Sequence, residues 1–563
     1  MINKKQTKTL FIPLGGCSEI GMNMYLYGIR SGKKTEYIMV DAGITFPDPE
    51  CSPGVEVIMP DTTFVEDNLE NVKAIFITHA HEDHIGALAH IFEYIQAPVY
   101  CRKFTALIAK AKIDRGGGDT NLVKVAQPYP KMVKAGLFNV GFFSMPHSIP
   151  EASGLVIDTP CGRIFHSGDF KIDKSPVLGE SFNSKALADL GKTGVMALIC
   201  DSTNVFSKHS GRSESPLLDN FIKLFEKTEG MIVATTFASN LARLKTLASA
   251  AQQTERSLVI LGRAMNNMIA IGHQSGVLKG FPQVISPRDA KAIPRKNLLV
   301  LASGSQGEPR AASAHLARDG YMGLTIQEGD KFLFSSKTIP GNELRVARII
   351  DKLVRRGVEV IEDIEGLYHV SGHANEPDLT RIHKLVNPDV LIPMHGEYRH
   401  LREHAKLAER SGIKSLVVTN GQVAEITPNA GTVITNEVTS GRVFLDGSFL
   451  VDEDEGIISD RIKLMNKGHV VISVLVTGSS PYFSFELASL GVPTLDDSKS
   501  RLIAELELGF DTFLNNSKVS SITKITNENI ESESRRFLNK FFKAELGKKP
   551  LISVCIHRDD HSG

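Results

Sequence analysis

The sequence predicts an α/β protein in which stacked sheets are covered by helices. Strand-like runs that end in glycine or polar turns recur through the first two hundred residues, and a stretch with helical spacing of apolar residues (85–95) interrupts them. The strand-like runs lie at 8–16, 23–29, 35–43, 72–80, 97–101, 139–147, 154–169 and 195–202. Alternation of the two patterns is typical of layered α/β folds.

Length and charge limit the kind of protein. At 563 residues the chain is too long for one compact core, so two to four domains are expected. Its 42% hydrophobic and 23% charged residues are ordinary for a soluble globular protein. Lys plus Arg equals Asp plus Glu at 64 each. The net charge therefore indicates no particular partner, and any nucleic-acid site would have to be a local basic groove.

The cysteines and the apolar segments bear on the compartment. Six cysteines are scattered without a C-x-x-C pair, which indicates reduced thiols rather than a disulfide framework. The first residues contain no long apolar segment followed by a small-residue cleavage site, and no run of eighteen apolar residues occurs. We therefore expect a cytoplasmic protein with no membrane span.

The stretch ITHAHEDHIGAL (77–88) carries the clearest chemical signal. It places His79, His81, Asp83 and His84 between the end of a predicted strand and the start of a predicted helix. Imidazole nitrogens and carboxylate oxygens are ligands for zinc and similar divalent ions. Burying so many polar groups without a partner is costly. The H-x-H-x-D-H pattern therefore predicts a metal site rather than a solvated loop.

Further candidate ligands end other predicted strands. His147, Asp169 and His395 each stand at the C-terminal edge of such a strand, where open α/β sheets gather their sites. Asp41 and Asp201 end two more strands and are expected to support the ligands by hydrogen bonding. The expected two-metal site has His79, His81 and His147 on one ion, Asp83, His84 and His395 on the other, and Asp169 with a hydroxide bridging both.

Charge arithmetic favours a phosphate substrate for such a site. Two divalent ions bring +4, and two aspartates with one hydroxide bring −3, so the centre carries about +1 and attracts a phosphodiester oxygen. Metal binding also lowers the pKa of water enough to supply hydroxide near neutrality. Thioester or lactam hydrolysis would use the same apparatus, so the metal site alone leaves the substrate class open.

The pattern H-x-H-x-D-H with separate downstream His, Asp and His motifs resembles the metallo-β-lactamase superfamily. Later segments, in their order and spacing, resemble the β-CASP nucleases and, among them, the bacterial ribonuclease J family. They are CDSTN (200–204), ASGSQGEP (302–309), IPGNE (339–343), YHVSGHA (368–374) and PMHGEYRHL (393–401). The resemblance covers the chain from about residue 10 to at least residue 450. It implies an αββα sandwich and the same metal ligands, position by position.

The middle of the chain has the pattern of a second α/β unit inserted into the first. Helical and strand-like segments alternate from 215 to 345, and the chain returns toward YHVSGHA only at about 347. Because His395 must reach the metal site, the middle unit is an insertion, which the resemblance identifies as the β-CASP domain. The expected ranges are 1–208 and 347–448 for the metallo-β-lactamase domain, 209–346 for the insertion, 449–465 for a linker and 466–563 for a small C-terminal α/β domain.

The resemblance also implies which residues act on the substrate. His373 is expected to protonate the leaving oxygen, a role that suits a near-neutral pKa, and Asp83 to take part in catalysis; a purely structural histidine at 373 is the alternative. Small residues and hydroxyls predict a nest for a 5′-monophosphate, one nucleotide from the metals, although ordinary turns explain the serines equally well. The expected members of the nest are His369, Val370, Ser371, Gly372 and His373, with Ser303, Gly304 and Ser305 from the insertion.

Other histidines and basic segments are expected to be less specific. His383, His400 and His404 are expected to be surface or helix histidines. Basic residues in 243–256 and 352–359 either line an RNA channel or form solvated helix faces.

The resemblance implies a metal-dependent ribonuclease that acts 5′-to-3′ on 5′-monophosphate RNA, with some internal cleavage, in RNA maturation, including rRNA processing, and in mRNA decay. Ligand type favours two zinc ions, with manganese or magnesium as alternatives. Expected partners are single-stranded RNA, further copies in a homodimer or homotetramer, and proteins of an RNA-degradation complex, such as a helicase or a second ribonuclease J subunit. The alternatives are a DNA-directed β-CASP nuclease, a small-molecule metallohydrolase and a non-catalytic RNA-binding scaffold.

Overall fold

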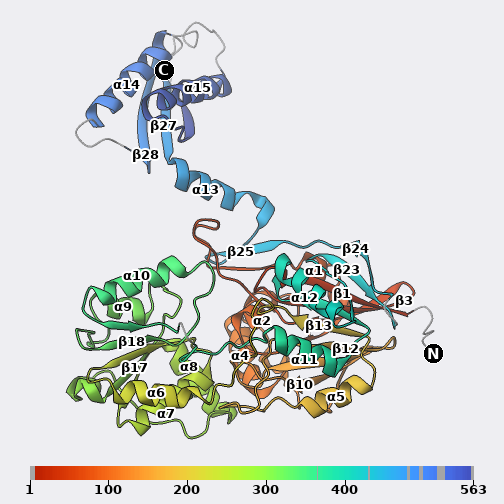
Figure 1. The fold of residues 1–563 in the computed structure, drawn as a ribbon. Coiled ribbons are helices and arrows are strands. Elements are labelled where there is room, and N and C mark those ends of the chain that lie inside the picture. The colour runs from red at the N-terminus through yellow and green to blue at the C-terminus, as the bar shows by residue number, and fades with distance from the viewer. Residues whose placement is uncertain are drawn as a thin grey trace. The chain divides into compact units, whose positions relative to one another are not determined.

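The computed structural model describes residues 7–363, 366–428, 431–477, 482–493, 499–516 and 526–559. The chain divides into two compact units. The first comprises residues 1–46 and 57–443, and the second comprises residues 47–56 and 444–563. Figure 1 shows the helices and strands of both.

Two mixed sheets form the centre of the first unit. The order in the eight-stranded sheet is β24 (Val433–Glu437), β23 (Gln422–Ile426), β1 (Thr7–Gly15), β3 (Met24–Ser31), β4 (Lys34–Val40), β6 (Val72–Phe76), β7 (Val99–Cys101), β8 (Val123–Val125). The order in the seven-stranded sheet is β22 (Lys414–Ser415), β20 (Val390–Met394), β13 (Ala197–Asp201), β12 (Arg163–His166), β11 (Ser153–Asp158), β10 (Phe138–Ser144), β9 (Val133–Ala135). In the first sheet, β4, β6, β7 and β8 are parallel, as are β12, β13, β20 and β22 in the second.

Alternation along each strand divides the apolar side chains between two faces. On β1, Phe11 packs between the sheets against residues of the second sheet such as Phe138, whereas Leu10 and Ile12 face outward. The outer face of the first sheet is covered by α2 (Glu82–Ile85), α3 (Leu88–Ile91) and α4 (Lys103–Arg115). The outer face of the second sheet is covered by α5 (Ser184–Lys192), α11 (Glu376–Val386) and α12 (Tyr398–Arg410). The αββα sandwich implied by the resemblance is confirmed.

The prediction of one continuous helix over residues 85–95 is wrong, because the helix is interrupted. The segment forms two short helices, α2 and α3, because the N–H of Ala87 donates to the carbonyl of Ala42 at 2.9 Å and so interrupts the helical ladder. This bond ties the segment to the end of β4. Two other short elements, β5 (Val57–Pro60) and α1 (Thr63–Glu66), precede β6.

The inserted domain contains a six-stranded parallel sheet. Its order is β16 (Val284–Ile285), β15 (Ser257–Leu261), β17 (Leu298–Ala302), β14 (Ile232–Thr235), β18 (Lys331–Phe334), β19 (Glu359–Ile361). One face packs on α6 (Leu217–Glu226), α7 (Leu241–Gln253) and α8 (Arg263–Ser275), and the other on α9 (Ala312–Arg318) and α10 (Glu343–Val354). Because both faces are covered, the central strands are apolar throughout. Most of α10 and all of β19 lie beyond residue 346, the boundary expected from the sequence.

The second unit contains a three-stranded sheet with two long helices packed on it. The strand order is β28 (Tyr482–Leu490), β27 (His469–Thr477), β29 (Leu551–Asp559), and the helices are α14 (Lys499–Asn516) and α15 (Asn527–Leu546). The segment 449–465, expected as a linker, contains β26 (Phe449–Asp452) and most of α13 (Ile457–Lys467), which follow β25 (Arg442–Asp446). Within the described part of the chain, every helix is too short or too polar to cross a bilayer.

Candidate metal centre and active site

The predicted metal ligands lie at strand ends of both sheets of the sandwich. His79 and His81 follow β6, and Asp83 and His84 lie in α2. On the second sheet, candidate ligands follow the ends of β10, β12 and β20. The structure gathers all seven into two groups, within each of which the possible ligand atoms lie within 4.8 Å of one another: His79, His81 and His147, and Asp83, His84, Asp169 and His395.

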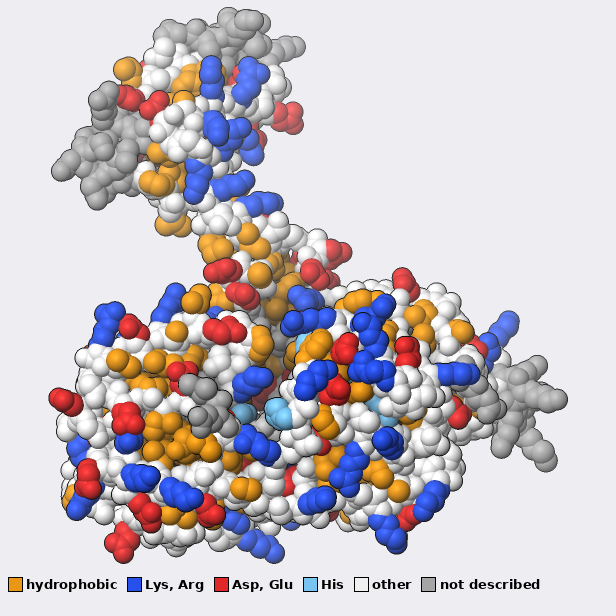
Figure 2. Space-filling view, in the orientation of Figure 1, with side chains coloured by type: hydrophobic (Ala, Val, Ile, Leu, Met, Phe, Trp, Pro, Cys, Tyr) orange, Lys and Arg blue, Asp and Glu red, His pale blue; other side chains and the backbone are white. Residues whose placement is uncertain are grey.

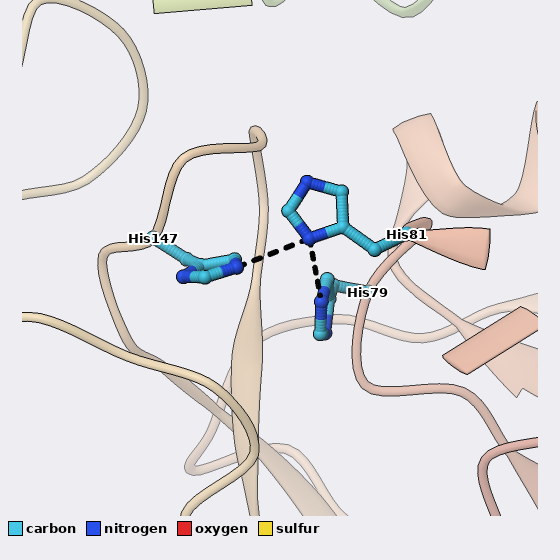
Figure 3. Close-up of side chains that lie close together, drawn as sticks. All are labelled: His79, His81 and His147. Atoms are coloured by element: carbon cyan, nitrogen blue, oxygen red, sulfur yellow. Dashed lines mark hydrogen bonds between the residues drawn. The ribbon is translucent and has the colours of Figure 1, made fainter. Parts of the chain in front are cut away.

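Three imidazoles converge in the first group (Figure 3). His81 Nδ1 lies 3.1 Å from His79 Nε2 and 3.1 Å from His147 Nε2. The other ring nitrogen of His147, Nδ1, lies 2.7 Å from the Gly372 carbonyl, to which it donates, so that Nε2 carries a lone pair. Two nitrogens bound to one zinc ion in tetrahedral geometry are about 3.3 Å apart. The spacing of these nitrogens is close to that value.

The protonation state of the three rings also favours a bound cation in this group. Burial lowers the pKa of His81 to about 4, although nearby carboxylates oppose the shift. Burial and neighbouring imidazoles lower the pKa of His79 and of His147 well below the usual value. The three rings are therefore neutral near pH 7 and can offer lone pairs to a metal ion.

Asp169 lies between the two groups. Its Oδ1 is 2.8 Å from His395 Nδ1, and its Oδ2 is 3.1 Å from His84 Nε2. The same Oδ2 lies 3.8 Å from His79 Nε2 and 3.9 Å from His147 Nε2. One carboxylate therefore faces both groups of candidate ligands.

Asp83 completes the second group. Its Oδ2 is 3.4 Å from His395 Nε2 and 3.6 Å from His84 Nε2. His395 Nε2 is buried and has no hydrogen-bond partner among the residues that the structure describes. Burial by itself would raise the pKa of Asp83 and of Asp169, but the facing imidazoles hold both well below the usual value. Ionised carboxylates beside open imidazole nitrogens are a donor set for divalent cations, so these residues fit a divalent metal centre.

Residues behind the candidate ligands orient them by hydrogen bonding. Asp41, which is fully buried, accepts from His84 Nδ1 at 2.8 Å and from the N–H and the hydroxyl of Thr78 at 2.7 and 2.8 Å. Sequence reasoning missed Asn23, whose Nδ2 donates to the Asp83 carbonyl at 3.0 Å and lies 3.0 Å from His84 Nε2. These contacts leave the His84 proton on Nδ1 and direct Nε2 into the centre. The local sequence GMNMY (21–25) does not indicate this role of Asn23, because the role depends on contact with α2.

A tight turn holds the segment after His395. The short strand β2 (Cys17–Ser18) pairs with β21 (Gly396–Glu397), and the N–H of Gly396 donates to the carbonyl of Gly16 at 3.2 Å. Gly16 has φ +82°, and a Cβ there would lie 2.4 Å from Asn23 Oδ1, so only glycine fits. The glycines of LGGC thus help to place His395.

His373 and Asp201 form a pair beside the candidate metal ligands. His373 Nδ1 lies 2.8 Å from Asp201 Oδ2, and the other carboxylate oxygen accepts from the N–H and the hydroxyl of Thr203 at 2.9 and 2.7 Å. The His373 ring centroid is 5.0 Å from that of His147. Asn204, which sequence reasoning also missed, donates from Nδ2 to Ser371 Oγ at 2.7 Å and to the His373 carbonyl at 3.4 Å. The CDSTN segment therefore positions His373 on two sides.

The residues expected to bind a 5′ phosphate fall in two places. Residues 369–373 belong to the segment that returns from the insertion, and 303–305 follow β17. The ends of β14 and β18 lie between them in the sheet order. Ser335, after β18, donates from Oγ to the Tyr368 carbonyl at 2.7 Å. Both segments therefore follow the C-terminal edge of the inserted sheet, but no hydrogen bond joins them in the described ranges.

The structure also places the other polar residues that the sequence singled out. Of the two positions expected for His383, His400 and His404, surface or helix, the helix is observed: they lie on α11 and α12 and are buried rather than at the surface. His383 and His404 face each other through their Nε2 atoms at 3.0 Å. Of the basic segment 243–256, Arg243 and Arg256 are buried and donate to groups inside the inserted domain, so they neither line an open channel nor lie on a solvated face.

Family models match most of the chain. Residues 21–197 match the metallo-β-lactamase superfamily, 229–353 the β-CASP domain of ribonuclease J, 357–418 the RNA specificity domain of zinc-dependent metallo-hydrolases, and 456–559 the C-terminal domain of ribonuclease J.

Full-length relatives agree with these matches. The chain is 36% identical to ribonuclease J of Sinorhizobium meliloti, with 97% of each chain covered. It is 32% identical to ribonuclease J of Thermus thermophilus, over 96% of this chain and 94% of the relative. Ribonuclease J2 of Bacillus subtilis is 29% identical over 99% of this chain and its own full length. A crystal structure of a protein of unknown function from Enterococcus faecalis has the same fold over 74% of this chain and all of its own, at TM-score 0.50 and 17% identity.

Proposed function

The chain belongs to the ribonuclease J family, and from that premise we propose that it degrades RNA 5′-to-3′ from a 5′-monophosphate end and also cleaves RNA internally. Its relatives and domain matches support a metal-dependent ribonuclease. The observation that carries the proposal is the meeting of seven His and Asp side chains from both sheets at one rim of the sandwich, with His373 beside them.

The metal ligands are assigned from the two groups. His79, His81 and His147 would hold one divalent ion, Asp83, His84 and His395 the other, and Asp169 would bind both. Imidazole-rich ligation favours zinc, with manganese or magnesium as alternatives. When bound, the ions supply Lewis acidity toward the phosphodiester and make a nucleophile available from water. The remaining chemistry belongs to the side chains around them.

His373 is the proposed general acid. Asp201 accepts the proton on Nδ1, so the ring is oriented with Nε2 away from that carboxylate. Burial alone would lower the pKa of His373, but the Asp201 and Asp169 carboxylates raise it above the usual value. The ring is thereby kept protonated near neutrality and can give the Nε2 proton to the leaving oxygen.

The segment 369–373 supports a site for the 5′ phosphate. Side chains outside the segment bond its carbonyls: Arg212 donates to the His369 carbonyl at 2.9 Å and His147 to the Gly372 carbonyl at 2.7 Å. The N–H groups of residues 369–372 have no hydrogen-bond partner within the described stretches. Free N–H groups in succession form a concavity for anions. Ser303–Ser305 are proposed to contribute donors from the end of β17.

The biological setting follows from the family. We propose single-stranded RNA as the substrate, in RNA maturation, including rRNA processing, and in mRNA decay. A homodimer or homotetramer and contacts with a helicase or a second ribonuclease J subunit are proposed partners. All six cysteines are free thiols, which supports a reducing compartment such as the cytoplasm.

The test compares RNAs that differ only in the 5′ end: monophosphate, triphosphate and hydroxyl. We expect rapid release of mononucleotides from the monophosphate RNA alone, and no release by His81→Ala. Equal rates on all three ends would remove the argument for the 5′ pocket. Hydrolysis of DNA in preference to RNA would favour a DNA-directed β-CASP nuclease, and metal binding without hydrolysis would favour a scaffold.

A further inference from the structure

Arg243 lies where the inserted domain joins the rest of the first unit. It is on α7, its side chain is fully buried, and its guanidinium forms an ion pair with Glu214, with Nη2 3.0 Å from Oε2. Glu214 is on the connection that leads into the insertion. Nη1 donates to the Ser335 carbonyl at 2.7 Å and to the Tyr368 carbonyl at 3.1 Å. One guanidinium thus links α7 to three other parts of the chain: the outgoing connection, which leads into the insertion and contains Glu214, the end of β18 at Ser335, and the returning segment, which leaves the insertion and contains Tyr368.

The same guanidinium faces one ring nitrogen of His369. Arg243 Nη1, which also donates to the two carbonyls, is 3.4 Å from His369 Nδ1. A guanidinium can only donate hydrogen bonds, so this contact favours the neutral tautomer that has its lone pair on Nδ1 and its proton on Nε2.

The surroundings of His369 keep the ring neutral. Burial and the neighbouring cations lower the pKa of His369 to about 3. Two of these cations already have carboxylate partners, since Glu214 pairs with Arg243 and Asp173 lies 3.0 Å from Lys171. The four cations come from four different elements: Arg243 on α7, Lys337 after β18, Arg212 on the outgoing connection and Lys171 after β12.

We propose that Arg243 is a positioning residue that holds His369 as a neutral imidazole with its proton on Nε2, so that the ring gives one directed N–H donor to the 5′ end of the RNA. The inference rests on the proposed function, because it assigns this donor to the same 5′ pocket. In this arrangement the other two cations, Lys337 and Arg212, supply the charge that attracts a phosphate, and His369 supplies direction. Recognition of the 5′ end then does not depend on protonation of the imidazole between pH 5 and 8.

The first test exchanges the two ring nitrogens of His369 for amides. His369→Gln places an N–H donor near the position of Nε2, whereas His369→Asn places it near Nδ1. We expect Gln to keep KM for 5′-monophosphate RNA within about threefold, and Asn to raise it about tenfold or more, as expected for loss of a hydrogen bond to a charged group.

The second test removes Arg243 without leaving Glu214 as an unpaired buried charge. In the double variant Arg243→Met, Glu214→Met, we expect KM for 5′-monophosphate RNA to acquire a pH dependence between pH 5 and 7.5 that the wild-type protein lacks. Each substrate is compared between proteins at the same pH, so the ionisation of the phosphate cancels. Arg256→Met is the matched control, because Arg256 is a buried arginine of the same domain that donates to carbonyls away from His369. A purely structural effect would lower the melting temperature of both variants but would change neither pH profile.

A readout independent of activity completes the design. With histidine as the only ¹⁵N-labelled residue, the signal missing from His369→Gln should show a proton on Nε2 and no titration between pH 5 and 7. If the wild-type protein does not prefer monophosphate ends, the proposed function fails, and the spectrum still decides whether the His369 ring is neutral with its proton on Nε2. If that preference is present but Gln and Asn are equally impaired, or the signal titrates, the inference alone is overturned.

Discussion

The buried histidine pair makes a quantitative prediction about stability and pH. His383 Nε2 lies 3.0 Å from His404 Nε2, and His404 Nδ1 lies 2.9 Å from Ser202 Oγ. Both rings are fully buried. Burial lowers the pKa of His383 to about 4, and burial with the neighbouring ring lowers the pKa of His404 well below the usual value. In the folded protein the pair is therefore neutral over the range where an unfolded histidine becomes protonated.

The sign and size of the change in stability with pH follow from the linkage between folding and proton binding. Because the folded-state pKa lies below the unfolded value of about 6.5, the unfolded chain binds more protons as pH falls, and stability is lost between about pH 6.5 and 4. From pH 8 to pH 5, a folded pKa of about 4 for His383 corresponds to a loss of about 2 kcal/mol. His404 adds a loss in the same direction.

The perturbation that isolates this effect is His383→Gln, whose amide can still donate to His404 but does not titrate. Urea unfolding is measured at pH 8 and pH 5 by circular dichroism, because the chain has no tryptophan. We expect the wild-type protein to lose about 2 kcal/mol more than the variant over this interval. Metal binding and other titrations affect both proteins and cancel in the comparison.

An exposed histidine provides the control for this measurement. His273→Gln removes an exposed histidine of α8 and should leave the wild-type pH dependence unchanged. If His383→Gln loses as much stability as the wild-type protein between the two pH values, the buried neutral pair does not exist in solution.

Three further predictions concern the candidate centre. Asp201→Asn removes the carboxylate that orients His373 at 2.8 Å, so we expect kcat to fall by about 10²-fold or more with KM little changed, measured by steady-state release of mononucleotides. Gly372→Ala places a Cβ 2.7 Å from His147 Cε1 and 2.9 Å from Ser148 Oγ, so we expect metal content, measured by elemental analysis, to fall together with activity. Chelation should abolish hydrolysis, and titration of the stripped protein with zinc or manganese should restore it and give the number of ions per chain.

One of these predictions has a matched control variant, and the other two have a refuting result. Gly509→Ala, on α14, places a Cβ at an ordinary 3.4 Å from Phe537 and should leave metal content and activity unchanged. An Asp201→Asn variant with wild-type kcat would remove His373 as an oriented acid. Full activity in the stripped protein would exclude a role for the ions.

Much of the centre could be predicted because its signals are local. His79, His81, Asp83 and His84 lie within six consecutive positions, and apolar alternation predicts the strand before them. His147, Asp169 and His395 could be added because the ends of neighbouring strands meet at one rim. The insertion followed from the need for His395 to return to that rim, although its end is at β19 rather than at residue 346.

By itself, the sequence predicted a layered α/β fold and seven candidate ligands, since strand periodicity and short motifs depend on neighbours along the chain, and the resemblance of those motifs implied the αββα sandwich and the family. Only the tertiary structure decided which ring nitrogen faces the centre, that Asn23 supports His84, and that Arg243, His383 and His404 are buried. Those properties depend on contacts between residues far apart in the chain. A hydrogen bond such as that from His147 to Gly372, 225 positions away, exists only after the sheets and the returning segment have packed together.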